Sequence, residues 1–117
     1  MAADDRVLST DVMTEPLSAD ELSPSDVVAG SPRVASADLE ESGGVSIGAW
    51  EITEGVVTDT EVDEVFLVLA GSGQIAFDDG LTVTLQPGAL VRLRAGDRTT
   101  WTITETLRKV YVILPSP

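Results

Sequence analysis

VDEVFLVLAGSGQIAFDDGLTVTLQPG, residues 62–88, alternates apolar runs with short breaks that contain turn residues. The runs are residues 64–70, 73–77 and 81–85, and the breaks are Gly71-Ser72-Gly73, Asp78-Asp79-Gly80 and Pro87-Gly88. Runs of this length between turn residues are typical of strands joined by tight turns. The stretch therefore predicts three antiparallel strands, the first of which begins with the carboxylate of Glu64 and is otherwise apolar.

The rest of the chain continues this pattern in both directions. Further strands are expected over residues 33–39, 45–52, 56–63, 89–93, 98–103 and 107–114, with the last two forming a hairpin around residues 104–106. Turn residues recur at the junctions, and no long helical pattern interrupts the series. Eight to ten short strands that follow one another roughly every eight residues predict an all-β sandwich or barrel.

The first 32 residues differ in composition, because Asp, Ser, Ala and Pro dominate and aliphatic side chains are scattered. Residues 1–15 are expected to be disordered, and residues 16–32 to lie on the domain as an irregular arm. Ser18 and Glu21 match a capping box, which predicts a short helical turn before Pro24. The expected organisation is an N-terminal arm, residues 1–32, followed by one β domain, residues 33–117.

The charge of the chain is strongly negative, with 20 Asp and Glu against 7 Lys and Arg and a net charge of −13. A field of this sign repels nucleic-acid phosphates and anionic membranes, so neither is an expected partner. Sixteen of the 20 acids lie in residues 1–64 and five of the seven bases in residues 92–109. This asymmetry predicts that the acidic arm and the basic C-terminal segment meet.

Neither cysteine nor histidine is present. Disulfides, thiol nucleophiles, zinc fingers and iron–sulfur ligation are therefore excluded. The lack of histidine also removes the commonest transition-metal ligand and the usual general base near neutral pH.

No targeting or membrane segment is expected from the sequence. Its start, MAADDRVLSTDV, carries acidic residues and lacks the apolar core of a signal peptide. No stretch approaches the roughly 20 apolar residues of a membrane-spanning helix. A cytoplasmic location is the resulting expectation.

Side-chain alternation in residues 64–70 predicts what each face of this strand contacts. Glu64, Phe66 and Val68 share one face, and Val65 and Leu67 share the other. If Glu64 faces the interior, the outer face is apolar as well, and a strand that is apolar on both faces is usually covered on both. The expected cover is a second subunit or the arm, so a homodimer is predicted.

Four sequence blocks carry a resemblance to a known family. They are IGAWEITEG from Ile47, DEVFLVLAGSGQIAFDDG from Asp63, LQPGALVRLRAG from Leu85, and TTWTITETLRKVYVIL from Thr99. In this order they resemble the cupin superfamily, in particular the branch of ureidoglycine aminohydrolases and ethanolamine-utilisation cupins. The most specific match is the terminal W-x-x-x-E-x-x-R-K block. The resemblance spans about residues 27–114 and implies a double-stranded β-helix, a jelly-roll barrel with a pocket at one end.

The resemblance also implies a ligand set that this chain lacks. A metal-binding cupin carries two histidines and a glutamate in its first motif and one histidine in its second. The glutamate position corresponds to Glu64, whereas the histidine positions fall at Thr58, Thr60 and Thr99. Neutral hydroxyl groups are weak ligands, so neither a transition metal nor another cofactor is expected.

An oxygen-ligated site is the alternative to a metal-free barrel. Asp59, Glu61 or Asp63 would assist Glu64 in holding Mg²⁺ or Ca²⁺, since both ions prefer oxygen ligands. In the favoured interpretation no metal is held, and the three threonines pack and form hydrogen bonds in the pocket.

Glu64 is the candidate catalytic residue, and two interpretations of it are open. A desolvated pocket carboxylate would act as a general base or anchor an amine. Alternatively, Glu64 pairs with Arg92 or Arg94, whose guanidinium groups would otherwise bind a carboxylate ligand. The candidate ligand-binding residues are Thr58, Thr60, Glu64, Arg92, Thr99 and Trp101.

Two residues of the terminal block have separate expectations. Trp101 shares the parity of Thr99 and Ile103, so it should point inward as a pocket wall or core residue. Lys109 is the only lysine of the chain. Nothing in its surroundings indicates a Schiff base, and a surface ion pair with Glu105 is expected.

Three functions are consistent with these features. The first is a metal-free homodimeric cupin that binds a small organic molecule in the barrel mouth. The second is a metal-independent enzyme that acts on a small nitrogenous or carboxylate metabolite, with Glu64 as acid–base. The third is a structural or regulatory dimer whose pocket is filled by its own side chains.

Overall fold

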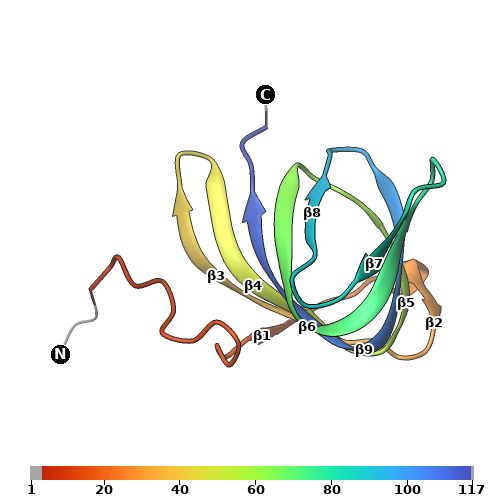
Figure 1. Cartoon of the computed structure of the whole chain (residues 1–117), viewed down its shortest axis with the longest axis horizontal. Coiled ribbons are helices and arrows are strands. Elements are labelled where there is room, and N and C mark those ends of the chain that lie inside the picture. Colours follow the sequence, from red (N-terminus) through yellow and green to blue (C-terminus); the bar gives the residue numbers. More distant parts are fainter. Residues whose placement is uncertain (1–3, 117) are drawn as a thin grey trace.

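The computed structural model describes residues 4–116, which form one curled β-sheet (Figure 1). Its nine strands and single 3-10 turn are β1 (Ser18–Asp20), η1 (Pro24–Asp26), β2 (Val27–Ala29), β3 (Val34–Ser42), β4 (Val45–Ile52), β5 (Gly55–Thr60), β6 (Glu64–Phe77), β7 (Thr82–Leu85), β8 (Leu90–Leu93) and β9 (Arg98–Ile113). All paired strands are antiparallel. The architecture confirms the predicted all-β jelly-roll barrel.

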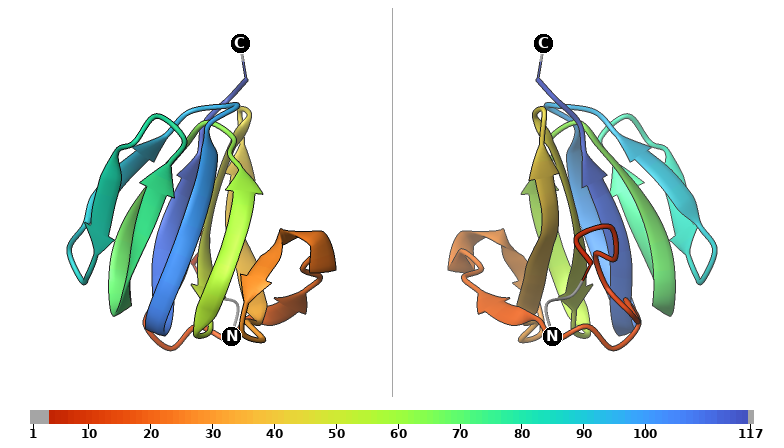
Figure 2. Two further views of the ribbon diagram at one scale, coloured as in Figure 1. Left: turned by 90° about the vertical axis from the view of Figure 1, so that its right-hand side faces the viewer. Right: turned by 90° about the vertical axis from the view of Figure 1, so that its left-hand side faces the viewer.

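Two long strands, β6 and β9, hold the barrel together. One half of β9 pairs with β5 and the other half with β4, while β6 pairs with β9 along most of its length. The opposite edge of β6 pairs with β8 in its first half and β7 in its second. The sheet therefore curls around a single interior, which Figure 2 shows from two sides.

The hairpins expected at residues 71–73 and 104–106 are wrong. Both segments lie inside continuous strands, and the β6–β9 register shifts between Val68 and Gly73. Gly71 has φ +93°, and a Cβ placed on it would lie 2.1 Å from the carbonyl oxygen of Thr106. Because the two irregular segments face each other, both strands bend at the same level and neither ends.

The predicted alternation in β6 is confirmed. Glu64, Phe66 and Val68 are buried in the interior, whereas Val65 is half-buried and Leu67 is 39% exposed. The core is aliphatic and aromatic, with side chains from both halves of β6 and β9 and from β4, β5, β7 and β8. Trp101 and Ile103 also point inward, as their parity predicts.

The arm contributes two short strands. β1 pairs with β3 and β2 pairs with β5, and Figure 2 shows this segment at one lower edge of the barrel. The helical turn predicted from Ser18 is wrong, because residues 18–20 pair with the exposed edge of β3 instead, and the Ser36 hydroxyl donates to Asp20. Residues 1–3, part of the segment expected to be disordered, lie outside the described residues.

The predicted contact between arm and C-terminal segment is confirmed within the chain. Arg108 Nη1 donates to the carbonyl oxygens of Val12 and Glu15, each at 3.0 Å. The guanidinium also pairs with Glu51, with Nε 3.2 Å from Oε1. The acidic arm thus meets the basic strand through its main-chain carbonyls. Among the described residues, no helix is long and apolar enough to cross a bilayer.

Candidate functional site

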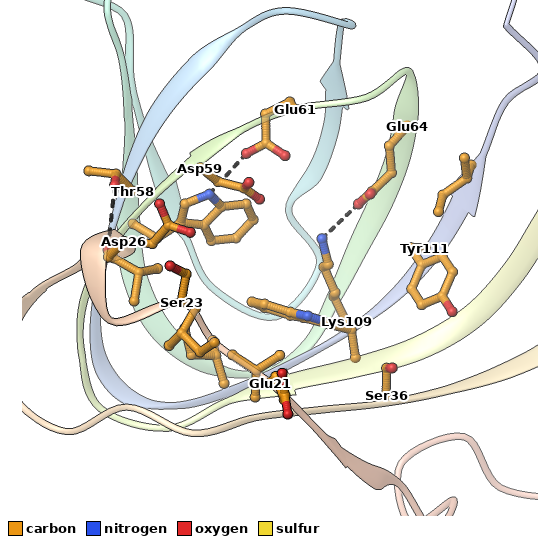
Figure 3. A pocket seen from close by; sticks show the side chains of 17 residues that line it. Glu21, Ser23, Asp26, Ser36, Thr58, Asp59, Glu61, Glu64, Lys109 and Tyr111 are labelled. Atoms are coloured by element: carbon orange, nitrogen blue, oxygen red, sulfur yellow. Dashed lines mark hydrogen bonds and ion pairs between the residues drawn. The ribbon is translucent and has the colours of Figure 1, made fainter.

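A cavity of about 400 Å³ opens at one end of the barrel. Strands β3, β4, β5, β6 and β9 supply its walls, and the segment around η1 covers one side (Figure 3). Its lining combines three aromatic side chains, Trp50, Trp101 and Tyr111, with five carboxyl groups and one lysine. The carboxyl groups belong to Glu21, Asp26, Asp59, Glu61 and Glu64.

Lys109 and Glu64 form an ion pair inside this cavity. Nζ of Lys109 lies 2.6 Å from Oε2 of Glu64, and their side chains are only 6% and 10% exposed. The ammonium also lies 4.6, 4.4 and 5.0 Å from the ring centroids of Trp50, Phe66 and Trp101. Cation–π attraction and the carboxylate together stabilise a charge that burial alone would disfavour.

The expected surface pair between Lys109 and Glu105 is therefore wrong. In the continuous strand β9, alternate residues from Thr99 to Tyr111 face inward except at the bend, and Lys109 belongs to this set. Glu105 lies at the bend, is exposed, and accepts a hydrogen bond from Ser72. With a hairpin expected around residues 104–106, residues 98–103 and 107–114 were separate strands, and nothing placed their inward-facing residues on one face. The alternation within each half is visible in the sequence.

The expected pairing of Glu64 with Arg92 or Arg94 is also wrong. Arg92 lies opposite Val65 and forms an ion pair with Asp63, with Nη2 3.2 Å from Oδ1. Its Nη1 also donates to the carbonyl oxygen of Leu93. Arg94 begins the turn after β8, where its main-chain N–H donates to Asp97. Arg92 lies on the other face from Glu64, because neighbouring residues of a strand alternate.

Glu61 is a second buried carboxyl group, only 7% exposed. Its Oε2 accepts hydrogen bonds from Thr99 Oγ1 at 2.6 Å and from Trp101 Nε1 at 3.1 Å. Burial raises the pKa of Glu61, the hydrogen bond from Thr99 opposes this rise, and the nearby Asp59 carboxylate adds to it. Trp101 is thus held as a cavity wall by its indole N–H.

The structure brings together half of the six predicted binding residues. Thr58, Glu64 and Trp101 line the cavity, and Thr58 Oγ1 lies 3.4 Å from the carbonyl oxygen of Asp26. Thr99 is buried behind Glu61 and reaches the site only through that carboxylate. Thr60 is exposed, and Arg92 pairs with Asp63; neither lines the cavity.

Sequence reasoning missed several lining groups. Trp50 and Tyr111 lie at inward-facing positions of β4 and β9, and the alternation that places them there can be followed in the sequence. Tyr111 donates its hydroxyl hydrogen to Asp38. Burial raises the pKa of Tyr111, and the bond to Asp38 and that carboxylate's charge raise it further. Glu21 and Asp26 come from the arm, whose position on the barrel no local pattern indicates.

The residues present do not fit the metal that a metal-binding barrel of this kind would hold. Threonine stands at three of the four ligand positions, and the remaining ligand, Glu64, already pairs with an ammonium. Asp63 faces Arg92 and the main-chain N–H of Ala95. In the described part of the chain, no group of three or more acidic side chains is placed to hold a metal ion.

Comparison with known proteins points to one family. The sequence profile of the EutQ-like cupin domain matches residues 39–111. Among solved structures, the Clostridium difficile EutQ protein is 26% identical with a TM-score of 0.65, over 82% of this chain and 81% of that chain. A protein of unknown function from Rhizobium leguminosarum is 29% identical with a TM-score of 0.65, over 71% of this chain and 82% of that chain.

A third structure shows the fold alone. A DUF861 family protein from Pseudomonas syringae is 23% identical with a TM-score of 0.77. The alignment covers 86% of this chain and 45% of that protein, so this chain spans less than half of it. No curated protein matches the sequence significantly.

Proposed function

The chain belongs to the EutQ-like cupin domain family, and we propose that it works without a metal ion and binds a small organic molecule in the cavity of its barrel. The observation that carries this proposal is the Lys109–Glu64 pair in a cavity of about 400 Å³. The ammonium provides a positive charge beside the one family ligand that remains. The free volume lies in the range of small-molecule pockets, roughly 300–1,000 Å³.

A second candidate is a metal-independent enzyme, and the same ion pair favours it. A carboxylate and an ammonium 2.6 Å apart place a proton acceptor and a proton donor side by side in an accessible cavity. In this case Glu64 is the acid–base group. Loss of turnover in Glu64→Gln with retained ligand binding would favour the enzyme over the binding protein. The cavity itself supports both of these functions over a purely structural dimer with a filled interior.

Metal analysis of the purified protein tests the first half of the proposal. The protein is purified without chelators and without an affinity metal, and Mn, Fe, Ni, Zn, Mg and Ca are measured against protein concentration. We expect each metal to be well below one equivalent. A stoichiometric transition metal that is lost in Glu64→Gln and retained in the exposed control Glu105→Gln would overturn the metal-free function.

Small-molecule binding tests the second half. Trp50 and Trp101 are the only tryptophans of the chain, and both line the cavity. Their indole N–H resonances therefore report on cavity occupancy without assignment of the whole spectrum. We expect members of a library of neutral, anionic and cationic metabolites to shift these two resonances saturably. A library that moves neither would contradict the proposed binding function.

A further inference from the structure

The charges around the cavity are unbalanced. Lys109 is its only basic lining residue and already pairs with Glu64. The other four carboxyl groups, of Glu21, Asp26, Asp59 and Glu61, form no ion pair with any described Lys or Arg. Figure 3 shows Asp26, Asp59 and Glu61 together on one side of the cavity, across from Glu64. This side has excess negative charge and room beside it.

Glu61 is the most informative of these groups, because the residue is only 7% exposed. Both of its described hydrogen bonds reach Oε2, and no described donor reaches Oε1. No fully buried side-chain oxygen or nitrogen of the described residues lacks a hydrogen-bond partner, so Oε1 is not fully buried, and Glu61 lines the cavity. A carboxylate oxygen that faces the cavity is able to accept a hydrogen bond from a cation or another donor that enters it.

The aromatic walls show independently which chemical group the cavity stabilises. Trp50, Phe66 and Trp101 already surround one ammonium, that of Lys109, at 4.4–5.0 Å from their ring centroids. Trp50 and Trp101 also line the free volume, as do Asp59 and Glu61, and Trp101 donates a hydrogen bond to Glu61. The faces of these rings and the carboxylates attract the same kind of group, an organic cation.

We propose that the cavity recognises an organic ammonium compound, a small primary amine or diamine whose charged nitrogen lies against Glu61 and Asp59. The proposal rests on the proposed binding function and names its ligand class. The alkyl part would pack against the indole rings, and the Lys109–Glu64 pair would stay intact at the base of the cavity. An anionic ligand would face four uncompensated carboxyl groups and is disfavoured.

A titration with three probes of equal length tests this assignment. The probes 1,4-diaminobutane, 1,4-butanediol and succinate share a four-carbon backbone and differ in charge. Each is added at constant ionic strength, and the two tryptophan indole resonances are followed. We expect saturable shifts with the diamine and none with the diol or the diacid. Binding of the diamine should weaken about tenfold or more in Glu61→Gln, because one charge-assisted hydrogen bond is lost.

Two further variants keep the test decisive. Asp59→Asn alters an exposed cavity carboxylate and should also weaken diamine binding, even if Glu61→Gln fails to fold. Asp78→Asn neutralises an exposed carboxylate outside the cavity and should leave the affinity unchanged. Equal affinity of wild type, Asp59→Asn and Asp78→Asn, or no diamine binding at all, would overturn the ligand class. If succinate or the diol alone bound and shifted the indoles, the ligand class would fail while the binding function stood.

Discussion

At the scale of single residues, the buried ion pair of Lys109 and Glu64 is the most exacting feature of the interior to satisfy electrostatically. Removing two charges from water is costly, and the pair is tolerable because ammonium and carboxylate lie 2.6 Å apart beneath three aromatic rings. If either partner is removed, the other charge stays buried without compensation. The two side chains are therefore expected to be energetically coupled.

Lys109→Met is expected to lower the free energy of unfolding by about 3–5 kcal/mol, because it leaves Glu64 unpaired in the interior. The double variant Lys109→Met/Glu64→Gln should recover much of this loss. Urea unfolding followed by tryptophan fluorescence gives both values. The control, Arg98→Met, removes an exposed pair with Asp78 and should cost less than about 1 kcal/mol. Additive losses from Lys109→Met and Glu64→Gln would show that the pair is uncoupled.

The sequence allowed part of this site to be predicted. Glu64 and Trp101 could be placed inside the barrel, because each lies in a strand with clear alternation. Lys109 could not be placed there, because a lysine close to an expected turn that contains Glu105 is usually exposed to solvent. Its position on the inward face follows only when β9 is known to be continuous. Asp26 and Glu21 depend on where the arm folds back, a long-range arrangement that no local pattern encodes.

At the scale of elements, the β6–β9 pair shows why strands were easier to predict than their connections. Glycine-rich and polar segments normally mark turns, and residues 78–80 do form one, with Gly80 N–H donating to the Phe77 carbonyl. Residues 71–73 have similar composition but lie opposite an equally irregular segment of β9. A bulge in two facing strands bends a sheet and closes it into a barrel. Composition alone does not distinguish the two outcomes.

Gly71→Ala is expected to destabilise the protein more than Gly80→Ala does. Both glycines have similar positive φ values, +93° and +100°, so the conformational strain of an L side chain is comparable. A Cβ at Gly71 would clash with the main chain at Thr106 and Leu107, whereas nothing lies within 4 Å of a Cβ at Gly80. We expect about 1–3 kcal/mol of strain at Gly80 and a clearly larger loss at Gly71, measured by urea unfolding. Equal losses would mean that the bulge relaxes to accept a side chain.

At the scale of the whole molecule, the outer face of β6 carries apolar side chains that the described chain leaves partly exposed. Leu67 lies between Leu90 of β8 and Val110 of β9, and the neighbouring row contains Val65 and Val112 beside Arg92, which pairs with Asp63. Leu90 is 70% exposed and Leu67 is 39% exposed. Besides pairing through β1 and β2, the arm reaches the outer face at Arg108, the outward-facing residue of β9 next to Val110. We therefore propose that a second copy of the chain covers the outer face, giving the homodimer predicted from the alternation of β6.

Leu67→Glu should convert this dimer into a monomer, because each subunit would bury a new carboxylate in the apolar contact. Light scattering coupled to size-exclusion chromatography measures the mass directly. Leu81→Glu is the matched control, since Leu81 is 56% exposed but lies beyond the Asp78–Gly80 turn at the far end of β6.

The affinity of the wild-type subunits for each other should also rise as salt is added from low ionic strength. Each chain has a net charge of −13, and salt screens the repulsion between the two subunits. A wild-type protein that is monomeric at high concentration and in high salt would contradict the dimer.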